Sequence, residues 1–463
     1  MAAIDPGSPV AISTGKVEIT PAAGYFMGGY GTDEPRTAGG EAKQPLYARC
    51  FALWENGLRG VIVTAEVLAI PPTMHHAIRD RVTALDVNGI SVASSYFAVT
   101  ATHTHNGPVL IEELNPFMAY NLTDLSEVEA YSSWLTDRIV DLVRATLGAP
   151  RTPCTLDYQV GQEGFSYNRE GLAYVERDVP ILAARDLTGQ PVAVLFSYGC
   201  HPVAAGGLRE WDSDYPGIAT AMIEKATGGF AMFLLGPAGD QDPVRQPVLA
   251  PGWDGMVTYG TQLGQTVLDA IAGVGRLLAA PNQAALSWVD LPLDIDDSAA
   301  NIAQVSADFQ ARLDYTNPGY PGWKKRHASV MIDQVASRSF RKSIPLPLQV
   351  WTLQGTPPLR LVLTGGELVS GYAVYLRRRY GGTDGVWVMG YANEVAAYIP
   401  SDELLFVSPG LQYACGWDPD FPGIGGGAMC VYGWLGRFVG RSPGAANDGV
   451  EQIIINQLTS MLA

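Results

Sequence analysis

Long apolar stretches, basic clusters and paired cysteines are scarce in this sequence of 463 residues. No stretch approaches the roughly 20 apolar residues needed to cross a bilayer, so no integral membrane association is expected. The 30 Lys and Arg residues are outnumbered by 46 Asp and Glu residues, which gives a net charge of −16. A chain this acidic is repelled by phosphate backbones, and this argues against nucleic-acid binding.

The cysteines are odd in number and widely spaced: Cys50, Cys154, Cys200, Cys415 and Cys430. Because no CxxC pair occurs, neither a disulfide scaffold nor a cysteine-rich zinc site is indicated. The first residues also lack the basic and then apolar order of a secretory signal. We therefore expect a cytoplasmic protein, with secretion after removal of a leader as the alternative. The sequence leaves a homo-oligomer open.

Apolar patterning predicts an α/β fold in which sheets are flanked by helices. The predicted strands are 51–54, 60–70, 96–102, 191–198, 230–235, 285–293, 346–353, 359–363 and 386–389. The predicted helices are 258–277, 299–315, 368–379, 450–462 and one that follows a capping-box pair, Asp124 and Glu127. The Gly- and Pro-containing stretch 317–326 is predicted to be a long loop. No repeat or low-complexity linker divides the chain, which favours one large unit.

Histidines stand at the ends of two predicted strands. In "THTHNGP" the residues His103 and His105 are two apart, so both side chains can enter one cavity, or each can hydrogen-bond to backbone. His201, in "SYGCHP", ends the strand 191–198 in the same way, although a single histidine there is more often structural. Active sites of α/β sheets gather at such strand ends.

A carboxylate follows a third strand. Glu367, in "LTGGELVSG", comes after the strand 359–363 and before a predicted helix. It can favour the helix N-terminus electrostatically, or it can join His103 and His201 as a metal ligand. Two neutral imidazoles and one carboxylate form a zinc ligand set that leaves a position for water. Sequence periodicity does not show whether the three strand ends meet.

Eight motifs along the chain resemble, in the same order, those of the neutral ceramidase family, the zinc-dependent non-lysosomal amidases. They are "VEITPAAGYFMGGYG", "QPLYARCFAL", "THTHNGP", "YNRE", "CHP" with "SDYPG", "GPAGDQDP", "GGELVSG" and "GYANEVAAYIPSDE". The resemblance implies an α/β catalytic domain of stacked mixed β-sheets flanked by helices. Because the sequence ends at Ala463, we expect a single catalytic domain over 1–463, without the immunoglobulin-like C-terminal domain of full ceramidases.

Carried over by position, the resemblance implies a Zn²⁺ site with four protein ligands: His103, His201, Glu367 and Tyr398. It also implies three catalytic residues beside the zinc: His105, Arg169 and Tyr413. His105 would pass a proton to the leaving amine, and Arg169 and Tyr413 would stabilise the oxyanion. The resemblance therefore predicts an amidohydrolase that cleaves a linear N-acyl amide, ceramide-like or smaller, with a metal-activated water.

The sequence departs from the family pattern at three positions near these motifs. Asn106 replaces the serine of "HTHSGP", Asp242 replaces the serine of "GDVSP", and Glu66 stands at the acidic position of "SxDxxG". These changes keep the four proposed ligands but put ceramide itself in doubt as the substrate. The alternative is an acyltransferase or a cyclising, lactam-processing enzyme of a biosynthetic pathway that uses the same zinc site. A serine hydrolase is disfavoured because no GxSxG elbow occurs.

Overall fold

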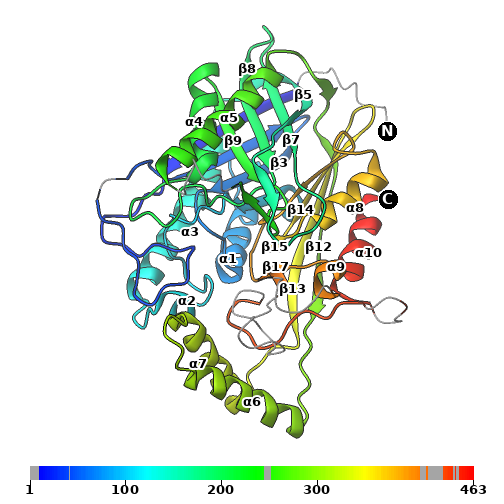
Figure 1. Cartoon of the computed structure of the whole chain (residues 1–463). Coiled ribbons are helices and arrows are strands. Elements are labelled where there is room, and N and C mark those ends of the chain that lie inside the picture. The colour runs from blue at the N-terminus through cyan, green and yellow to red at the C-terminus, as the bar shows by residue number, and fades with distance from the viewer. Residues whose placement is uncertain are drawn as a thin grey trace.

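The computed structural model describes residues 10–40, 42–244, 252–406, 413–415, 431–441, 444 and 448–463. Within these ranges, mixed β-sheets pack on a shared apolar interior and helices cover their outer faces (Figure 1). This arrangement confirms the predicted fold class of stacked mixed sheets flanked by helices. None of the described helices combines the length and the apolar character needed to span a bilayer.

The larger sheet has the order β4-β3-β2-β1-β5-β7-β8-β9, with β11 on β5. Its strands are β1 (Val10–Glu18), β2 (Tyr47–Trp54), β3 (Leu58–Ala65), β4 (Phe97–Ala101), β5 (Thr152–Gln162), β7 (Asp178–Arg185), β8 (Pro191–Tyr198), β9 (Phe230–Leu235) and β11 (Arg276–Leu278). The pairs β3–β4 and β8–β9 are parallel, and the other pairs are antiparallel.

The larger sheet bends back on itself at its centre. β1 and β5 pair only from Val10 to Ile12, opposite Thr152 to Cys154, so the join between the two halves is short. The inner face of β2 then approaches β9, where the Arg49 guanidinium donates to the carbonyl of Ala231 at 3.3 Å. This bend brings the carboxyl ends of β4 and β8 together, although the two strands lie far apart in the strand order.

A smaller sheet has the order β12-β13-β14-β16 and closes the interior. Its strands are β12 (Pro281–Pro292), β13 (Ser343–Leu353), β14 (Leu359–Thr364) and β16 (Val386–Met389). Two short pairs complete the site region: β6 (Ser166–Asn168) with β10 (Gln241–Pro243), and β15 (Glu367–Leu368) with β17 (Tyr398–Ile399). Trp351, Leu361 and Trp387 of the smaller sheet pack against the inner face of the larger one.

Helices cover three outer faces. α1 (Pro72–Thr83) and α3 (Ser126–Gly148) pack on β1–β4, and α4 (Asp214–Thr227) and α5 (Trp253–Ile271) pack on β7–β9. α8 (Gly371–Tyr380) and α10 (Val450–Leu462) cover the smaller sheet. α6 (Ala299–Asp314) and α7 (Gly322–Ser337) form a hairpin that contacts the short α2 (Pro116–Tyr120) (Figure 1). The short helix α9 (Asp402–Phe406) and two 3-10 turns, η1 (Ser94–Tyr96) and η2 (Tyr413–Cys415), complete the elements.

Every predicted strand overlaps an observed one, but several predicted boundaries are wrong. The strand predicted over 60–70 ends at Ala65, and the helix predicted over 258–277 ends at Ile271 because residues 276–278 form β11. The predicted capping box is absent: Leu125 is the N-cap of α3, and Asp124 accepts from the Ser126 N–H at 3.0 Å. Half of the predicted loop 317–326 is helical, since α7 begins at Gly322.

Four of the five cysteines lie among the described residues, and all four are buried. Cys50, Cys154 and Cys200 are free, and Cys430 lies outside the described residues.

Candidate metal centre

The two strand-end histidines project into one buried space. His103 follows β4, and its φ of 67° lies in the left-handed region that non-glycine residues seldom adopt. Its N–H donates to the Val67 carbonyl at 2.9 Å, which holds this unusual turn in place. His201 follows β8, and its N–H donates to the Gln241 carbonyl at 2.8 Å. Both side chains are buried.

The tautomers of His103 and His201 follow from their backbone partners. The Nδ1 atom of His103 lies 2.6 Å from the Leu68 carbonyl oxygen, and that of His201 lies 2.8 Å from the Ala238 carbonyl oxygen. Carbonyl oxygens only accept, so both Nδ1 atoms carry a proton, and in the neutral form of each ring Nε2 carries a lone pair. The two Nε2 atoms face each other at 3.0 Å. Two lone pairs at this distance repel each other unless a cation lies between them.

Glu367 adds a negative oxygen to the same point. Its Oε2 lies 3.3 Å from Nε2 of His103 and 3.5 Å from Nε2 of His201. Burial opposes ionisation of this carboxyl group, but His103 and His201 outweigh burial and lower its pKa to about 2. The pKa of His201 is lowered to about 3, chiefly by burial. Neutral imidazoles and an ionised carboxylate are the protonation states that a metal ligand requires.

Tyr398 lies beside Glu367 because the two are register partners in the parallel β15–β17 pair. Its ring stacks on His201 with an interplanar angle of 11° and a centroid distance of 6.5 Å. Burial raises the pKa of its phenol, whereas Arg169, which donates to the phenol oxygen at 3.0 Å, lowers it. A bound cation would further favour the phenolate. The structure brings Tyr398 to the site, and its role as fourth ligand stays a prediction.

His105 faces the same space from the side. Its ring centroid is 4.9 Å from that of His103 and 5.3 Å from that of His201. Both of its ring nitrogens are buried without a hydrogen-bond partner among the described residues. Ring nitrogens of these three histidines lie within 4.8 Å of one another, so the geometry suits His105 either as a neighbour of a metal or as a ligand. Its predicted role as proton shuttle stays a prediction.

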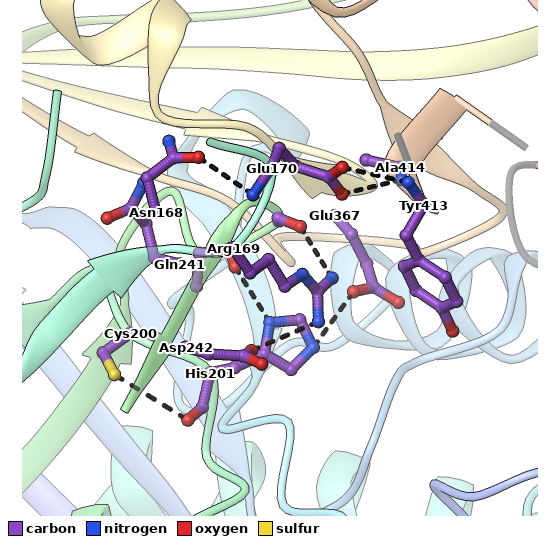
Figure 2. Close-up of polar contacts among 12 residues, drawn as sticks. Asn168, Arg169, Glu170, Cys200, His201, Gln241, Asp242, Glu367, Tyr413 and Ala414 are labelled. Atoms are coloured by element: carbon purple, nitrogen blue, oxygen red, sulfur yellow. Dashed lines mark hydrogen bonds and ion pairs between the residues drawn. The ribbon is translucent and has the colours of Figure 1, made fainter. Parts of the chain in front are cut away.

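Arg169 is a site residue and not a surface cation. It follows β6, its side chain is 17% exposed, and it donates to the Gly239 carbonyl at 2.7 Å as well as to Tyr398. It also donates to Asp242 of β10 at 3.2 Å (Figure 2). Its guanidinium carbon lies 5.0 Å from the centroid of the Tyr413 ring. The rings of Tyr398 and Tyr413 and the Asp242 carboxylate thus fix the guanidinium group next to His201.

Two further solved structures share this arrangement of elements. No protein-family model matches the chain, and no curated protein matches it. The neutral ceramidase from Pseudomonas aeruginosa superposes with a TM-score of 0.61 at 18% identity, over 86% of this chain and 69% of that one. A ceramidase complexed with C2 superposes with a TM-score of 0.62 at 18% identity, over 92% of this chain and 73% of that one. The chain has the neutral ceramidase fold. The resemblance inferred from the motifs is therefore confirmed as a likeness of fold.

Within this ceramidase fold, the departures from the family motifs have different surroundings. Asp242 pairs with Arg169 inside the site. Asn106, the residue after His105, accepts from Arg36 at 2.6 Å and donates to Asp212 at 2.9 Å. Glu66 accepts from the Tyr47 N–H at 2.9 Å and pairs with Arg49 at 3.6 Å, a structural role away from the histidines.

Sequence patterns missed several residues that line the site. Tyr391 and Tyr432 donate from their hydroxyls to Glu367. The Tyr30 ring lies 5.0 Å from the His105 ring, and Arg36 donates to the His105 carbonyl. Tyr391, in "MGYANE", comes two residues after the end of the strand 386–389, as His103 does after β4. The other residues come from loops and stand at no such strand end.

A second histidine cluster in the ceramidase fold also gathers potential metal ligands: His75, His76 and Glu394. The Arg79 Nε donates to Nε2 of His75 at 2.8 Å, so the His75 proton must be on Nδ1, which lies 2.9 Å from Glu394. A protonated nitrogen has no lone pair for a metal. We interpret this cluster as a hydrogen-bond chain that anchors the loop before β17 to α1.

Proposed function

We propose that this protein is a zinc-dependent amidohydrolase that cleaves linear N-acyl amides with a metal-activated water. The observation that carries the proposal is the convergence of Nε2 of His103 and Nε2 of His201, 3.0 Å apart, with both Nδ1 atoms on backbone carbonyls and the Glu367 carboxylate beside both rings. The fold of neutral ceramidases supports the reaction class, because their name denotes cleavage of an N-acyl amide.

The proposed ligands are His103, His201, Glu367 and Tyr398. Their donor set of two imidazoles and oxygens suits Zn²⁺, and the backbone carbonyls on both Nδ1 atoms orient the imidazoles. Bound zinc would lower the pKa of a water ligand to about 7 and would polarise the substrate carbonyl.

Three residues of the chain would transfer the proton of the reaction and bind the negative charge of its intermediate. Burial, followed by His103 and His201, lowers the pKa of His105 well below its usual value, so its imidazole is neutral. With both ring nitrogens unpartnered, His105 would take a proton from the nucleophilic water and deliver it to the leaving amine. Arg169 and the Tyr413 hydroxyl would bind the negative oxygen of the tetrahedral intermediate.

Asp242 bears on which N-acyl amide the protein would cleave. Asp242 adds a carboxylate beside Arg169 at the position where the ceramidase motif has a serine. This departure puts ceramide itself in doubt, so the proposed substrate class is a linear N-acyl amide that is either ceramide-like or smaller.

The proposal is tested with purified, zinc-loaded protein on N-acyl amides that run from N-acetyl alkylamines to long-chain ceramides. We expect release of free amine, loss of turnover on chelation, and its return with zinc. His103→Ala and Glu367→Ala should lose both zinc and turnover, whereas His76→Ala in the second cluster should keep both. An added amine acceptor tests for acyl transfer. Full turnover by metal-free protein would overturn the proposal.

A further inference from the structure

Glu170, the neighbour of Arg169, makes contacts that the proposed chemistry leaves unexplained. Its carboxylate accepts two consecutive peptide N–H groups, that of Tyr413 on Oε2 and that of Ala414 on Oε1, each at 2.9 Å (Figure 2). Glu170 is buried. These bonds join two segments that are more than 240 positions apart in the chain.

The Glu170 carboxylate is itself held rigidly. The Glu170 N–H donates to Oδ1 of Asn168 at 3.0 Å, and the Asn168 side chain donates to Asp240 at 2.8 Å. The Arg169 N–H donates to the Asp240 carbonyl at 2.9 Å. Arg169 and Glu170 therefore project from one fixed turn, with the guanidinium directed to the histidines and the carboxylate directed to η2.

The Tyr413 ring closes the same side of the site. It lies edge-on to Tyr398, with centroids 5.5 Å apart, and 5.0 Å from the Arg169 guanidinium carbon. Tyr413 remains 41% exposed, so packing alone holds the ring only in part. Hydrogen bonds from N–H groups to a carboxylate are shorter and stronger than those to a neutral oxygen. Two of them from adjacent residues fix both the place and the direction of η2.

We propose that Glu170 is a positioning residue that holds the Tyr413 hydroxyl where the reacting carbonyl oxygen becomes negative. The proposal rests on the proposed amidohydrolase function. Glu170 touches no reacting atom and acts through Tyr413, so removing its carboxylate should matter only while the Tyr413 hydroxyl is present.

A double-mutant cycle with Glu170→Gln and Tyr413→Phe tests this dependence in the zinc-loaded protein. Glutamine keeps one acceptor oxygen but turns an N–H₂ group toward a peptide N–H. Tyr413→Phe should lower kcat by about 10²-fold, as for the loss of one oxyanion donor. Glu170→Gln should lower kcat by about 10-fold or more with little change in KM, because a displaced group weakens the transition state. The double variant should be no slower than Tyr413→Phe, and multiplicative losses would overturn the proposal.

Glu176→Gln is the matched control. Glu176 is also a buried glutamate with two hydrogen bonds at 2.8 Å, but its partner is Arg377 on α8. It should keep wild-type kcat and should combine multiplicatively with Tyr413→Phe.

A second measurement is independent of turnover. Chymotrypsin cleaves after tyrosine, and cleavage at Tyr413–Ala414, followed by mass spectrometry, should be faster in Glu170→Gln than in the wild type or in Glu176→Gln. Equal rates in all three proteins would overturn the anchoring role. If the wild type hydrolyses no amide but Glu170→Gln is cleaved faster, the proposed function fails and the anchor stands.

Discussion

We predict that the first histidine cluster, around His103 and His201, binds zinc and that the second, around His75 and His76, does not. In the first, the Nδ1 protons of His103 and His201 point to carbonyls and the Nε2 lone pairs converge. In the second, Arg79 occupies Nε2 of His75, and the proton on Nδ1 points to Glu394. Only the first cluster should stabilise the protein when zinc is added after chelation.

The size of this stabilisation follows from mass action. Zinc at about 1,000 times its Kd raises the free energy of unfolding by about 4.1 kcal/mol. An unfolding entropy of about 2.1 cal/mol/K per residue gives about 1 kcal/mol/K for a chain of this length. Zinc should therefore raise Tm by about 4 °C.

The assay is scanning calorimetry of chelated and zinc-loaded wild type, His201→Ala and His76→Ala, with metal content measured on the same samples. His76 is 58% exposed at its side chain, so its replacement should disturb the fold little. His201→Ala should lose nearly all of the 4 °C rise, and His76→Ala should keep it. A rise retained in His201→Ala but lost in His76→Ala would refute the assignment of protons and, with it, the metal centre.

Three further predictions concern single side chains. His105→Ala should keep zinc and lower kcat by about 10²- to 10⁴-fold, measured together on one sample; loss of zinc would make His105 a ligand instead. Arg169→Lys should lower kcat by about 10²-fold with a smaller change in KM, because one ammonium nitrogen cannot replace both Nη1, which contacts Asp242, and Nη2, which contacts Gly239 and Tyr398; unchanged kcat would exclude Arg169 from oxyanion binding. Burial raises the pKa of Glu113 from 4.5 to about 8, so the folded chain binds this proton more tightly, and the stability it adds is complete below about pH 4.5 and is lost as the pH rises through 8. Glu113→Gln should remove up to about 1.4 kcal/mol per pH unit of that slope in urea unfolding between pH 5 and 8, and an unchanged slope would contradict it.

The strands that carry the site were predictable because they are apolar on both faces. β4 and β8 are buried along most of their length, so their sequences are mostly apolar and each ends two or three residues before His103 or His201. β1 was not predicted, because its outer half alternates between half-buried and exposed residues. Yet the short β1–β5 pairing is what bends the sheet and brings the two histidines together. Their convergence is therefore a property of the whole sheet, which local patterns do not contain.

The contacts around the ligand set were less predictable for a similar reason. Glu367 was a candidate because it follows a strand, and Tyr398 was named through a family resemblance; a pairing of only two residues per strand places them side by side. Tyr432 reaches Glu367 from a distant loop, and Glu170 reaches η2 across most of the chain. Gly322 was assigned to a loop because "NPGYPG" is typical of turns, whereas Pro321 serves as the N-cap of α7.

The bent sheet has a consequence for biogenesis. His103 is supplied by the first half of the larger sheet, His201 by the second half and Glu367 by the strand pair next to the smaller sheet, so a nascent chain that ends before Glu367 lacks part of the proposed ligand set. The proposed metal binding would then come after the sheets have assembled. The ion would bind to the folded protein and would not nucleate its folding.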